Sequence, residues 1–296
     1  MGFNKRSTAE DVTDGLDLSG KTVVITGVNS GLGLESMRVL ALRGARVIGL
    51  ARTQAKADEA CASVPGNTLG LPCELSDLAS VQACVRAIEA LDTPIDILMT
   101  NAGIMAPMQM SRANGVEMQF ATNHLGHFVL VEGLRGRVEQ ARGRIVILSS
   151  AAHTLTVSGG IDFDNLDAAQ GYNPWRFYGQ SKLANLLHAR ELARRLEGTG
   201  VTVNALHPGI IRTNLARDTG GFMTKLMTLF APLLEKTLEQ GAATQCYVAT
   251  HPELDGVTGQ YFSDCKSTKS SAWGRDEALA RELWQHSERL AAGYLS

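Results

Sequence analysis

Tyr178 and Lys182 are the two residues whose types and spacing most directly indicate chemistry in this chain. On a helix, residues four positions apart lie on one face, with their Cβ atoms about 5–6 Å apart. A neighbouring ammonium group stabilises a phenolate, so it should lower the pKa of the tyrosine. A phenol tuned in this way can give or take a proton near neutral pH, as carbonyl reduction and alcohol oxidation require. The pair alone proves little, so the surrounding motifs decide its meaning.

A glycine-rich segment, Thr26–Gly33, follows the first predicted strand and opens a helix. Glycines at such a turn let the backbone approach a pyrophosphate, which the N-terminus of the helix attracts. The alternative is an ordinary glycine-rich turn between a strand and a helix. The order G-x-x-x-G-x-G differs from the common G-x-G-x-x-G fingerprint, yet its position predicts a dinucleotide site.

The second predicted strand ends in Ala51, followed by Arg52 and Thr53. A site that prefers NAD places Asp or Glu there to hold the 2′-hydroxyl of the ribose. An arginine can instead pair bidentately with a 2′-phosphate. The alternative is a solvated arginine at a helix start, where the helix dipole mildly disfavours a cation. The sequence therefore favours NADP(H), with NAD(H) as the other possibility.

Polar residues also follow two later strands, with Asn101-Ala102-Gly103 after the fourth and Ser149-Ser150 after the fifth. Strand carboxyl ends face the ligand crevice in open α/β sheets, although Asn, Gly and Ser are common there as turn residues. Asn123 lies inside an apolar helical pattern, where an amide needs hydrogen-bond partners. It is interpreted as functional, the alternative being an amide that kinks a core helix.

The histidines are interpreted as structural. His153 resembles a catalytic base near Ser150 but is read as a polar loop residue, and no G-x-S-x-G elbow supports a hydrolase. His124, His127 and His207 lack metal-ligand spacing with thiols or carboxylates, so packing and hydrogen bonding are predicted for them. No metal site is expected.

The bulk properties narrow the class of protein. The 296 residues carry a formal net charge of −2 with dispersed charges, which argues against nucleic acid as a partner. Five cysteines without a C-x-x-C motif indicate neither a disulfide framework nor a zinc site, so a reducing, cytoplasmic location is expected. No apolar run is long enough for a membrane span.

Short β-branched runs alternate with helical patterns, which predicts an α/β doubly wound Rossmann fold: a mostly parallel, seven-stranded sheet with helices on both faces. The predicted strands are Thr22–Thr26, Arg46–Leu50, Thr68–Leu71, Ile95–Thr100, Arg144–Ser149, Val201–Leu206 and Gln260–Ser263. The predicted helices are Gly31–Arg43, Ala55–Ala62, Asp77–Leu91, Gly115–Val138, Trp175–Glu197, Leu238–Thr250 and about Arg275–Ala291.

One domain is predicted over residues 19–296, after an N-terminal extension of residues 1–18. Residues 151–174 and 212–236 are expected as insertions above the strand ends. The second of these is rich in Phe, Met and Leu, and is interpreted as a lid over an apolar substrate pocket.

Taken in order, these motifs resemble the short-chain dehydrogenase/reductase family, in its single-domain branch. The matching elements are Thr26–Gly33, Asn101–Gly103, Asn123, Ser150, Tyr178-x-x-x-Lys182 and Pro208–Thr213. Further runs resemble the retinol-dehydrogenase-like and WW-domain-oxidoreductase-like subgroup, namely Ala121–Phe128, Asp162–Leu166, Gln180–Leu187 and His207–Gly209. The resemblance extends from about Leu18 to Ser263.

The resemblance implies a catalytic role for four residues. Tyr178 would be the general acid/base and Lys182 would depress its pKa and bind the nicotinamide ribose, while Ser150 would hold the substrate oxygen. Asn123 would anchor a water molecule in a proton relay. Together with Arg52 and Thr53, the cofactor-binding residues would be Gly27, Asn29, Ser30, Gly31, Leu32, Gly33, Glu74, Leu75, Asn101, Ala102, Gly103, Tyr178, Lys182, Pro208, Gly209, Ile211 and Thr213.

Two departures from the family pattern bear on these roles. Glu74-Leu75 stands where the family usually has Asp-Leu, which affects the expected adenine contact. The membrane anchors of many animal retinol dehydrogenases are also not found, which weakens the case for a retinoid substrate.

The sequence thus predicts an NADP(H)-dependent oxidoreductase acting on a lipophilic aldehyde, ketone or secondary alcohol. The alternative is a dinucleotide-binding sensor or scaffold without catalysis, which would be expected to lose the tyrosine, lysine or serine. A sugar-nucleotide epimerase or dehydratase is disfavoured by the glycine spacing. The resemblance further implies a homodimer or homotetramer built on the helices predicted at Gly115–Val138 and Trp175–Glu197, unless the final helix blocks a contact.

Overall fold

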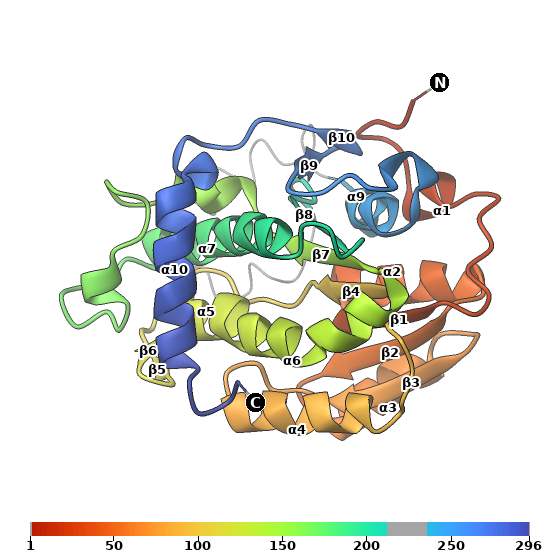
Figure 1. Cartoon of the computed structure of the whole chain (residues 1–296), viewed down its shortest axis with the longest axis horizontal. Coiled ribbons are helices and arrows are strands. Elements are labelled where there is room, and N and C mark those ends of the chain that lie inside the picture. Colours follow the sequence, from red (N-terminus) through yellow and green to blue (C-terminus); the bar gives the residue numbers. More distant parts are fainter. Residues whose placement is uncertain (1, 212–235, 296) are drawn as a thin grey trace.

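A central, mostly parallel sheet organises the computed structural model, which describes residues 2–211 and 236–295. Within this part of the chain the sheet has eight strands in the order β10-β9-β8-β7-β4-β1-β2-β3 (Figure 1). The predicted doubly wound α/β fold is confirmed, but the predicted number of seven strands is wrong. The additional strand, β10 (Lys266–Ser267), runs antiparallel to β9 and has only two residues, too few to show an alternating pattern.

The sheet strands are β1 (Thr22–Thr26), β2 (Arg46–Ala51), β3 (Thr68–Pro72), β4 (Ile97–Thr100), β7 (Arg144–Leu148), β8 (Thr202–Leu206), β9 (Tyr261–Ser263) and β10. A separate hairpin joins β5 (Arg112–Ala113) to β6 (Val116–Glu117). The α-helices are α1 (Ala9–Val12), α2 (Gly31–Leu42), α3 (Gln54–Ala62), α4 (Leu78–Glu89), α5 (Met118–Phe120), α6 (Gly126–Ala141), α7 (Pro174–Arg195), α9 (Leu238–Thr250) and α10 (Glu277–Leu290).

Both faces of the sheet are buried, as the apolar strands predict. Along β1, Val24 packs into one apolar cluster with α4, α6 and α7, whereas Val23 and Ile25 pack into a second cluster with α2 and α9. Successive strand side chains point to opposite faces, so one continuous apolar run supplies both cores. The result is a three-layer arrangement that presents the carboxyl ends of the parallel strands along one edge (Figure 1).

The helix predicted at Gly115–Val138 differs most from the structure. Its residues 115–117 belong to the turn and second strand of the hairpin β5–β6, the short helix α5 follows, and α6 begins only at Gly126. Between α5 and α6, η1 (Ala121–Leu125) is a π-helical turn that contains Asn123. The apolar pattern runs through both kinds of turn, so it does not reveal this widening. A π-turn inside a helix is rare and frequently marks a functional site.

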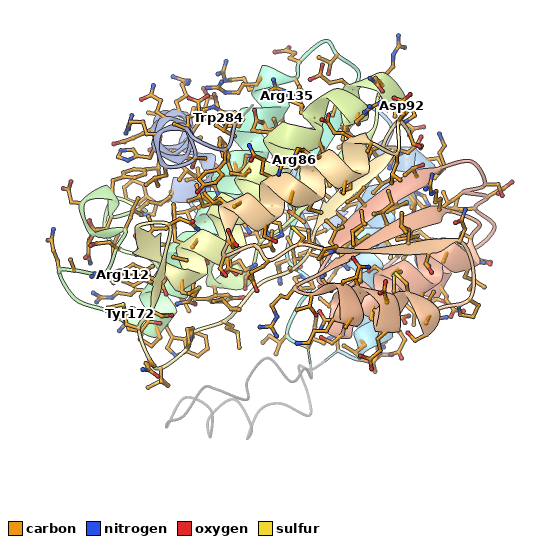
Figure 2. The ribbon with its side chains drawn as sticks, turned by 90° about the horizontal axis from the view of Figure 1, so that it is seen from below. Arg86, Asp92, Arg112, Arg135, Tyr172 and Trp284 are labelled. Atoms are coloured by element: carbon orange, nitrogen blue, oxygen red, sulfur yellow. The ribbon has the colours of Figure 1, made fainter. Side chains whose placement is uncertain are left out.

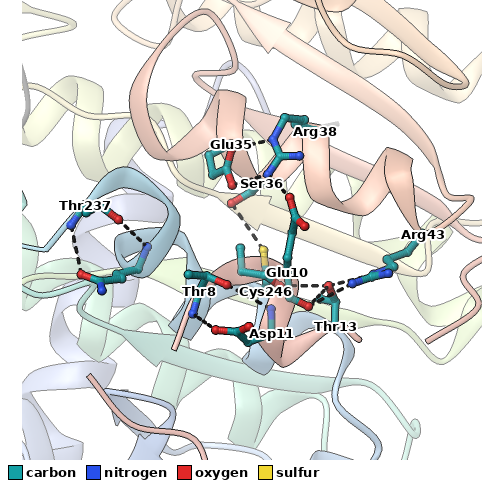
Figure 3. A network of polar contacts seen from close by, with 12 residues as sticks. Thr8, Glu10, Asp11, Thr13, Glu35, Ser36, Arg38, Arg43, Thr237 and Cys246 are labelled. Atoms are coloured by element: carbon teal, nitrogen blue, oxygen red, sulfur yellow. Dashed lines mark hydrogen bonds and ion pairs between the residues drawn. The ribbon is translucent and has the colours of Figure 1, made fainter. Parts of the chain in front are cut away.

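The N-terminal residues 2–18 lie against the domain. The short helix α1 packs on α2 and α9, and Thr8 and Asp11 form a capping box at its start. Arg38 of α2 forms ion pairs with both Glu10 and Glu35, and Arg43 donates a hydrogen bond to the Glu10 carbonyl oxygen (Figure 3). These contacts hold α1 against α2, the helix that follows the glycine-rich segment.

The helix α10 confirms the predicted C-terminal helix and lies against α7, as Figure 1 shows. Its Trp284 packs under the Arg195 guanidinium at 4.1 Å, and its Ser287 hydroxyl lies 2.7 Å from His124 Nε2. α7 is one of the helices predicted to join subunits, so α10 occupies part of that surface, and the oligomeric state stays a prediction. Among the described residues no helix is both long and apolar enough to cross a membrane.

Three buried imidazoles lie between η1, α6, α7 and α10. Burial holds the pKa of His127 at about 4 and that of His188 at about 3, and it also lowers the pKa of His124. The rings of His124 and His188 pack with that of Phe128, and His188 also packs with Trp284. His127 instead forms hydrogen bonds with Thr26 and Asn123. The prediction that His124 and His127 are packing or hydrogen-bonding residues is confirmed, and these imidazoles stay neutral in the fold.

We therefore expect stability to decline as the pH falls below about 6.5, because the unfolded chain then binds protons that the folded chain excludes. At pH 5 each buried imidazole should cost up to about 2 kcal/mol of the free energy of unfolding. His188→Phe removes one such group and should flatten this decline. Urea unfolding at pH 7.5 and pH 5.0 measures the decline in the free energy of unfolding for the wild type and the variant. An equal decline in the variant and the wild type would contradict the assignment.

Candidate active site

Residues from β4, η1 and α7 meet at the carboxyl edge of the sheet. A Cβ atom placed on Gly103 would lie 3.0 Å from Asn123 Oδ1 and 3.4 Å from Lys182 Nζ. Gly103 follows β4, Asn123 lies in the π-turn and Lys182 lies on α7. Three segments that are distant in sequence are thus in contact, as their predicted common role requires. A side chain at position 103 would require Asn123 or Lys182 to shift.

The Asn123 side chain is the connection between these segments. Its Oδ1 accepts a hydrogen bond from Ile104 N at 2.8 Å, and its Nδ2 donates to Ile104 O at 2.9 Å. Nδ2 also donates to Ser181 Oγ at 2.9 Å, and that hydroxyl donates to Tyr178 O at 2.8 Å. The buried amide is therefore well satisfied, and it joins the segment after β4 to the helix that carries Tyr178.

Lys182 is almost completely buried, with an exposed fraction of 4%. Its Nζ donates to Leu148 O at 3.2 Å and lies 5.9 Å from the centroid of the Tyr178 ring. Asn185 Nδ2 donates to the same carbonyl at 3.0 Å. Burial lowers the pKa of Lys182 to about 8, because the charged ammonium is poorly solvated there.

Tyr178 differs from the sequence-based expectation. Burial raises its pKa above the ordinary value, and the neighbouring Ser150 hydroxyl lowers it only in part. The prediction that Lys182 lowers the pKa of Tyr178 is therefore wrong for the protein without a bound ligand. The ammonium group is directed to the Leu148 carbonyl and is itself destabilised by burial, so desolvation of the phenolate is the larger effect.

Ser150 lies directly beyond β7 and is held by its own loop. Its Oγ accepts a hydrogen bond from Ala152 N at 3.1 Å and so caps the 3-10 turn η2 (Ala151–Thr154). His153 Nδ1 donates to Ser150 O at 2.7 Å, and His153 Nε2 accepts from Ser271 N at 3.1 Å. His153 is buried rather than a solvated loop residue, and it braces the backbone of Ser150.

Gly179, between Tyr178 and Lys182, permits the loop of Ser150 to approach α7. A Cβ atom there would lie 2.0 Å from Leu155 O and 2.8 Å from Ala152 O. A glycine inside a long helix costs stability and usually has a packing reason. A glycine at position 179 of a predicted helix is therefore the one signal in the sequence for this close approach.

The glycine-rich segment forms a cradle at the start of α2. Gly27 has φ +75° and lies against Ala102, and a Cβ atom on Gly33 would lie 2.2 Å from Gly27 O. Gly31, at φ +61°, has open space around it, and Ser30 makes no side-chain hydrogen bond at the helix N-cap. The first N–H groups of a helix have no partner within the helix, and here no N-cap side chain binds them. They can therefore donate hydrogen bonds to the phosphates of a dinucleotide.

Thr26 joins this cradle to the Asn123 segment. Its Oγ1 accepts hydrogen bonds from Asn101 N and Ala102 N, each at 2.9 Å, and lies 2.9 Å from His127 Nε2. His127 Nδ1 in turn lies 2.9 Å from Asn123 O. The sequence gives no signal for this role of Thr26 and His127, because it follows only from the contact of α6 with β1.

Arg52 and Thr53 follow β2 as predicted. Arg52 is exposed, and among the described residues it has no hydrogen bond or ion pair. Thr53 Oγ1 accepts a hydrogen bond from Lys56 N at 3.4 Å and caps α3. The arginine side chain is thus free to contact a ligand above the second strand.

The remaining predicted residues lie on the same edge. Glu74 Oε1 accepts a hydrogen bond from Ser76 Oγ at 2.8 Å, and Leu75 O lies against Gly126. Ile211 and Leu32 both pack against Gly241 of α9, which joins the segment after β8 to the glycine-rich segment. Pro208 and Gly209 also follow β8, Asn29 lies in the cradle, and Thr213 and the predicted lid up to residue 235 lie outside the described residues.

Chemically, this edge combines a buried phenol, a serine hydroxyl and a lysine beside the glycine-rich cradle. A phenol and a hydroxyl at one place can hold an oxygen atom and exchange a proton with it. Of the described residues, no group of three or more His, Cys, Asp or Glu residues has the arrangement to hold a metal ion. The geometry favours proton chemistry at an oxygen next to a dinucleotide.

Comparisons with known proteins agree with this geometry. Residues 21–163 match the family model described as short chain dehydrogenase. The chain is 45% identical to the short-chain dehydrogenase TIC 32 B, chloroplastic, of Brassica napus, over 98% of this chain and 94% of that protein. It is 42% identical to human retinol dehydrogenase 14, over 92% and 86%. A solved structure of an uncharacterized protein from Mycobacterium paratuberculosis is similar, with a TM-score of 0.77, 34% identity and 95% and 97% coverage.

Gly179→Ala should destabilise the protein, because the added methyl group would overlap Leu155 O. We expect the loss from overpacking, about 1–3 kcal/mol, to exceed the gain of up to about 1 kcal/mol in helix propensity. Chemical unfolding measures the difference.

Gly136→Ala is the matched control. Gly136 lies on α6 with no atom within 4 Å of the added Cβ, so this variant should be stabilised by up to about 1 kcal/mol. A stabilised Gly179→Ala variant would show that the approach of the Ser150 loop to α7 is not close.

Proposed function

Because the chain belongs to the short-chain dehydrogenase/reductase family, in its retinol-dehydrogenase-like subgroup, we propose that it interconverts carbonyl and alcohol groups with NADP(H) as cofactor. The observation that carries this proposal is the contact of Gly103 with both Asn123 and Lys182, one turn of helix from Tyr178. The contact supports the proposal because Asn123 and Lys182, two of the residues with predicted catalytic roles, lie beside the segment that follows β4.

Tyr178 acts as the general acid in reduction and the general base in oxidation. In reduction, the substrate carbonyl oxygen accepts a hydrogen bond from Ser150 Oγ and takes the proton of the Tyr178 hydroxyl. When bound, the nicotinamide supplies the hydride for the carbonyl carbon. Burial raises the pKa of Tyr178, so the residue is protonated at neutral pH and ready to donate.

Lys182 stabilises the phenolate that remains after proton transfer. Its Nζ lies 5.9 Å from the ring centroid, within range for a substantial electrostatic attraction in a poorly solvated site. The Asn123 side chain has one acceptor position left on Oδ1 after its bond to Ile104 N. That position is where the water of the predicted proton relay would bind.

The choice of NADP(H) rests on Arg52. The residue stands directly beyond β2, is exposed, and has no partner among the described residues. A guanidinium group there can form a bidentate, charge-assisted pair with a 2′-phosphate. We propose NAD(H) only as the weaker cofactor, because no carboxylate follows β2 to hold a 2′-hydroxyl.

A lipophilic substrate is supported by the apolar side chains at the same edge. Met108, Leu155 and Ile210 are 58%, 49% and 49% exposed, and they follow β4, η2 and β8 respectively. Large apolar side chains that stay exposed near strand carboxyl ends can contribute to a binding surface. We therefore propose a lipophilic aldehyde, ketone or secondary alcohol as the substrate.

Tyr178→Phe should abolish most of the turnover while the cofactor still binds. Loss of a general acid typically costs about 10²–10⁴-fold in rate, so kcat/KM for a lipophilic aldehyde should fall by at least about 100-fold. Nicotinamide absorbance follows turnover, and fluorescence titration follows NADPH binding. Near-normal turnover by this variant would show that Tyr178 is not the general acid.

Arg52→Ala should weaken NADPH but not NADH. A hydrogen-bonded charge pair contributes about 1.5–3 kcal/mol, so KM for NADPH should rise by about 10–100-fold. Arg86→Ala removes another exposed arginine on α4, on a helix that follows β3 (Figure 2), and serves as the control with both cofactors unchanged. Equal effects of Arg52→Ala on NADPH and NADH would refute a 2′-phosphate contact.

A further inference from the structure

The segment from Gly103 to Pro107 leaves the candidate active site and is held by hydrogen bonds at three successive points. Asn123 binds both backbone groups of Ile104, as described above. Ala106 N donates to Gln119 Oε1 at 2.8 Å, and Pro107 O accepts from the Tyr172 hydroxyl at 2.6 Å. We call Gln119 and Tyr172, with these two bonds, the clasp.

Gln119 is oriented by a buried carboxylate. Glu117 accepts hydrogen bonds from Gln119 N at 2.8 Å and Phe120 N at 3.1 Å, and from Gln119 Nε2 at 3.2 Å. Gln119 Nε2 also donates to Pro174 O at 3.1 Å. Nε2 of Gln119 therefore faces hydrogen-bond acceptors, and its Oε1 is oriented to accept the hydrogen bond from Ala106 N.

Tyr172 joins the clasp to the start of α7. Its hydroxyl donates to Pro107 O and accepts from Gln119 Nε2 at 3.4 Å. Its ring packs on that of Phe177, with centroids 5.4 Å apart, next to Tyr178. Figure 2 shows Tyr172 at the same end of the molecule as Arg112 of the β5–β6 hairpin. Burial raises the pKa of Tyr172 to about 12, so the hydroxyl keeps its proton.

Ala106 gives independent evidence that this segment is constrained. It is completely buried and has φ +44°, in the left-handed region that residues other than glycine rarely adopt. Such a conformation persists only where surrounding contacts determine it, and it clusters at functional sites. The bond from Ala106 N to Gln119 supplies a contact at that residue.

Beyond the clasp the chain becomes exposed and apolar. Met108 and Met110 lie within three residues of Pro107, and both side chains are exposed. The hairpin β5–β6 begins only at Arg112. The clasp is thus the last fixed point before the methionines.

We propose that Gln119 and Tyr172 are positioning residues that fix Ile104–Met110 as one wall of the substrate site. The inference rests on the proposed function and deepens it, because the wall selects substrates with a long apolar chain. Neither residue touches the reacting atoms. The clasp sets how tightly a long substrate binds and leaves the proton transfer by Tyr178 unchanged.

Tyr172→Phe removes one hydroxyl and keeps the ring, so it tests the clasp directly. The KM for decanal should rise about three- to tenfold, as expected for the loss of one buried hydrogen bond. The kcat for decanal should stay within about twofold, because the residues that transfer the proton are untouched. The KM for propanal, whose chain of three carbons offers little apolar surface for the wall to contact, should not change.

Two further variants complete the design. Tyr247→Phe is the matched control, because it also removes one tyrosine hydroxyl. That hydroxyl donates to Glu253 at 3.3 Å near the end of α9 and takes no part in the clasp, so the KM for both aldehydes should stay unchanged. Gln119→Glu places a second carboxylate beside Glu117 and removes the donor to Pro174 O. It should raise the KM for decanal at least as much as Tyr172→Phe does, again without a matching loss of kcat.

Hydrogen exchange separates failure of the clasp from failure of the proposed function. The amides of residues 104–111 should exchange at least about tenfold faster in Tyr172→Phe than in the wild type, and those of β1 should not. Unchanged exchange, or an equal rise in KM for decanal and propanal, would overturn the clasp. A wild type that reduces neither aldehyde would refute the proposed substrate, while the exchange rates would still decide the role of Tyr172.

Discussion

The hydrogen bonds of the Asn123 side chain are the constraint on which the rest of the site depends. Each donor or acceptor of a buried amide that lacks a hydrogen-bond partner lowers the stability of the fold by about 1–3 kcal/mol. Here the π-turn η1 places Asn123 so that one side chain binds both backbone groups of Ile104 and the hydroxyl of Ser181. The segment after β4 and the helix α7 are therefore fixed relative to each other before any ligand binds.

The same turn also connects the two halves of the site. His127 lies between the Asn123 carbonyl oxygen and the Thr26 hydroxyl, which itself accepts two backbone N–H groups of the segment after β4. A neutral imidazole that donates from Nδ1 and accepts at Nε2 satisfies both contacts, and burial keeps His127 neutral. The cradle at Gly27 and the lysine on α7 thus share one hydrogen-bonded framework.

Much of this could be predicted from the sequence, because it depends on local patterns. The apolar strands, the glycine turn and the four-residue spacing of Tyr178 and Lys182 each leave a short-range signature. The π-turn, the strand β10 and the hairpin before α5 leave none, since a pattern of apolar residues is similar for an α-turn and a π-turn. The clasp at Gln119 and Tyr172 joins residues 53 positions apart, and it depends on packing that no local pattern contains.

The electrostatics of the site were the least predictable part, because burial acts on both members of the central pair. It raises the pKa of Tyr178 and lowers that of Lys182, so it shifts each group toward its neutral form. An ammonium and a phenolate that face each other in a poorly solvated site stabilise each other against this shift. In the proposed mechanism, transfer of the Tyr178 proton to a substrate oxygen creates that phenolate, and so raises the tendency of Lys182 to hold its own proton. The spacing of four residues therefore matters less for lowering the pKa of a resting tyrosine than for stabilising the charge that proton transfer creates.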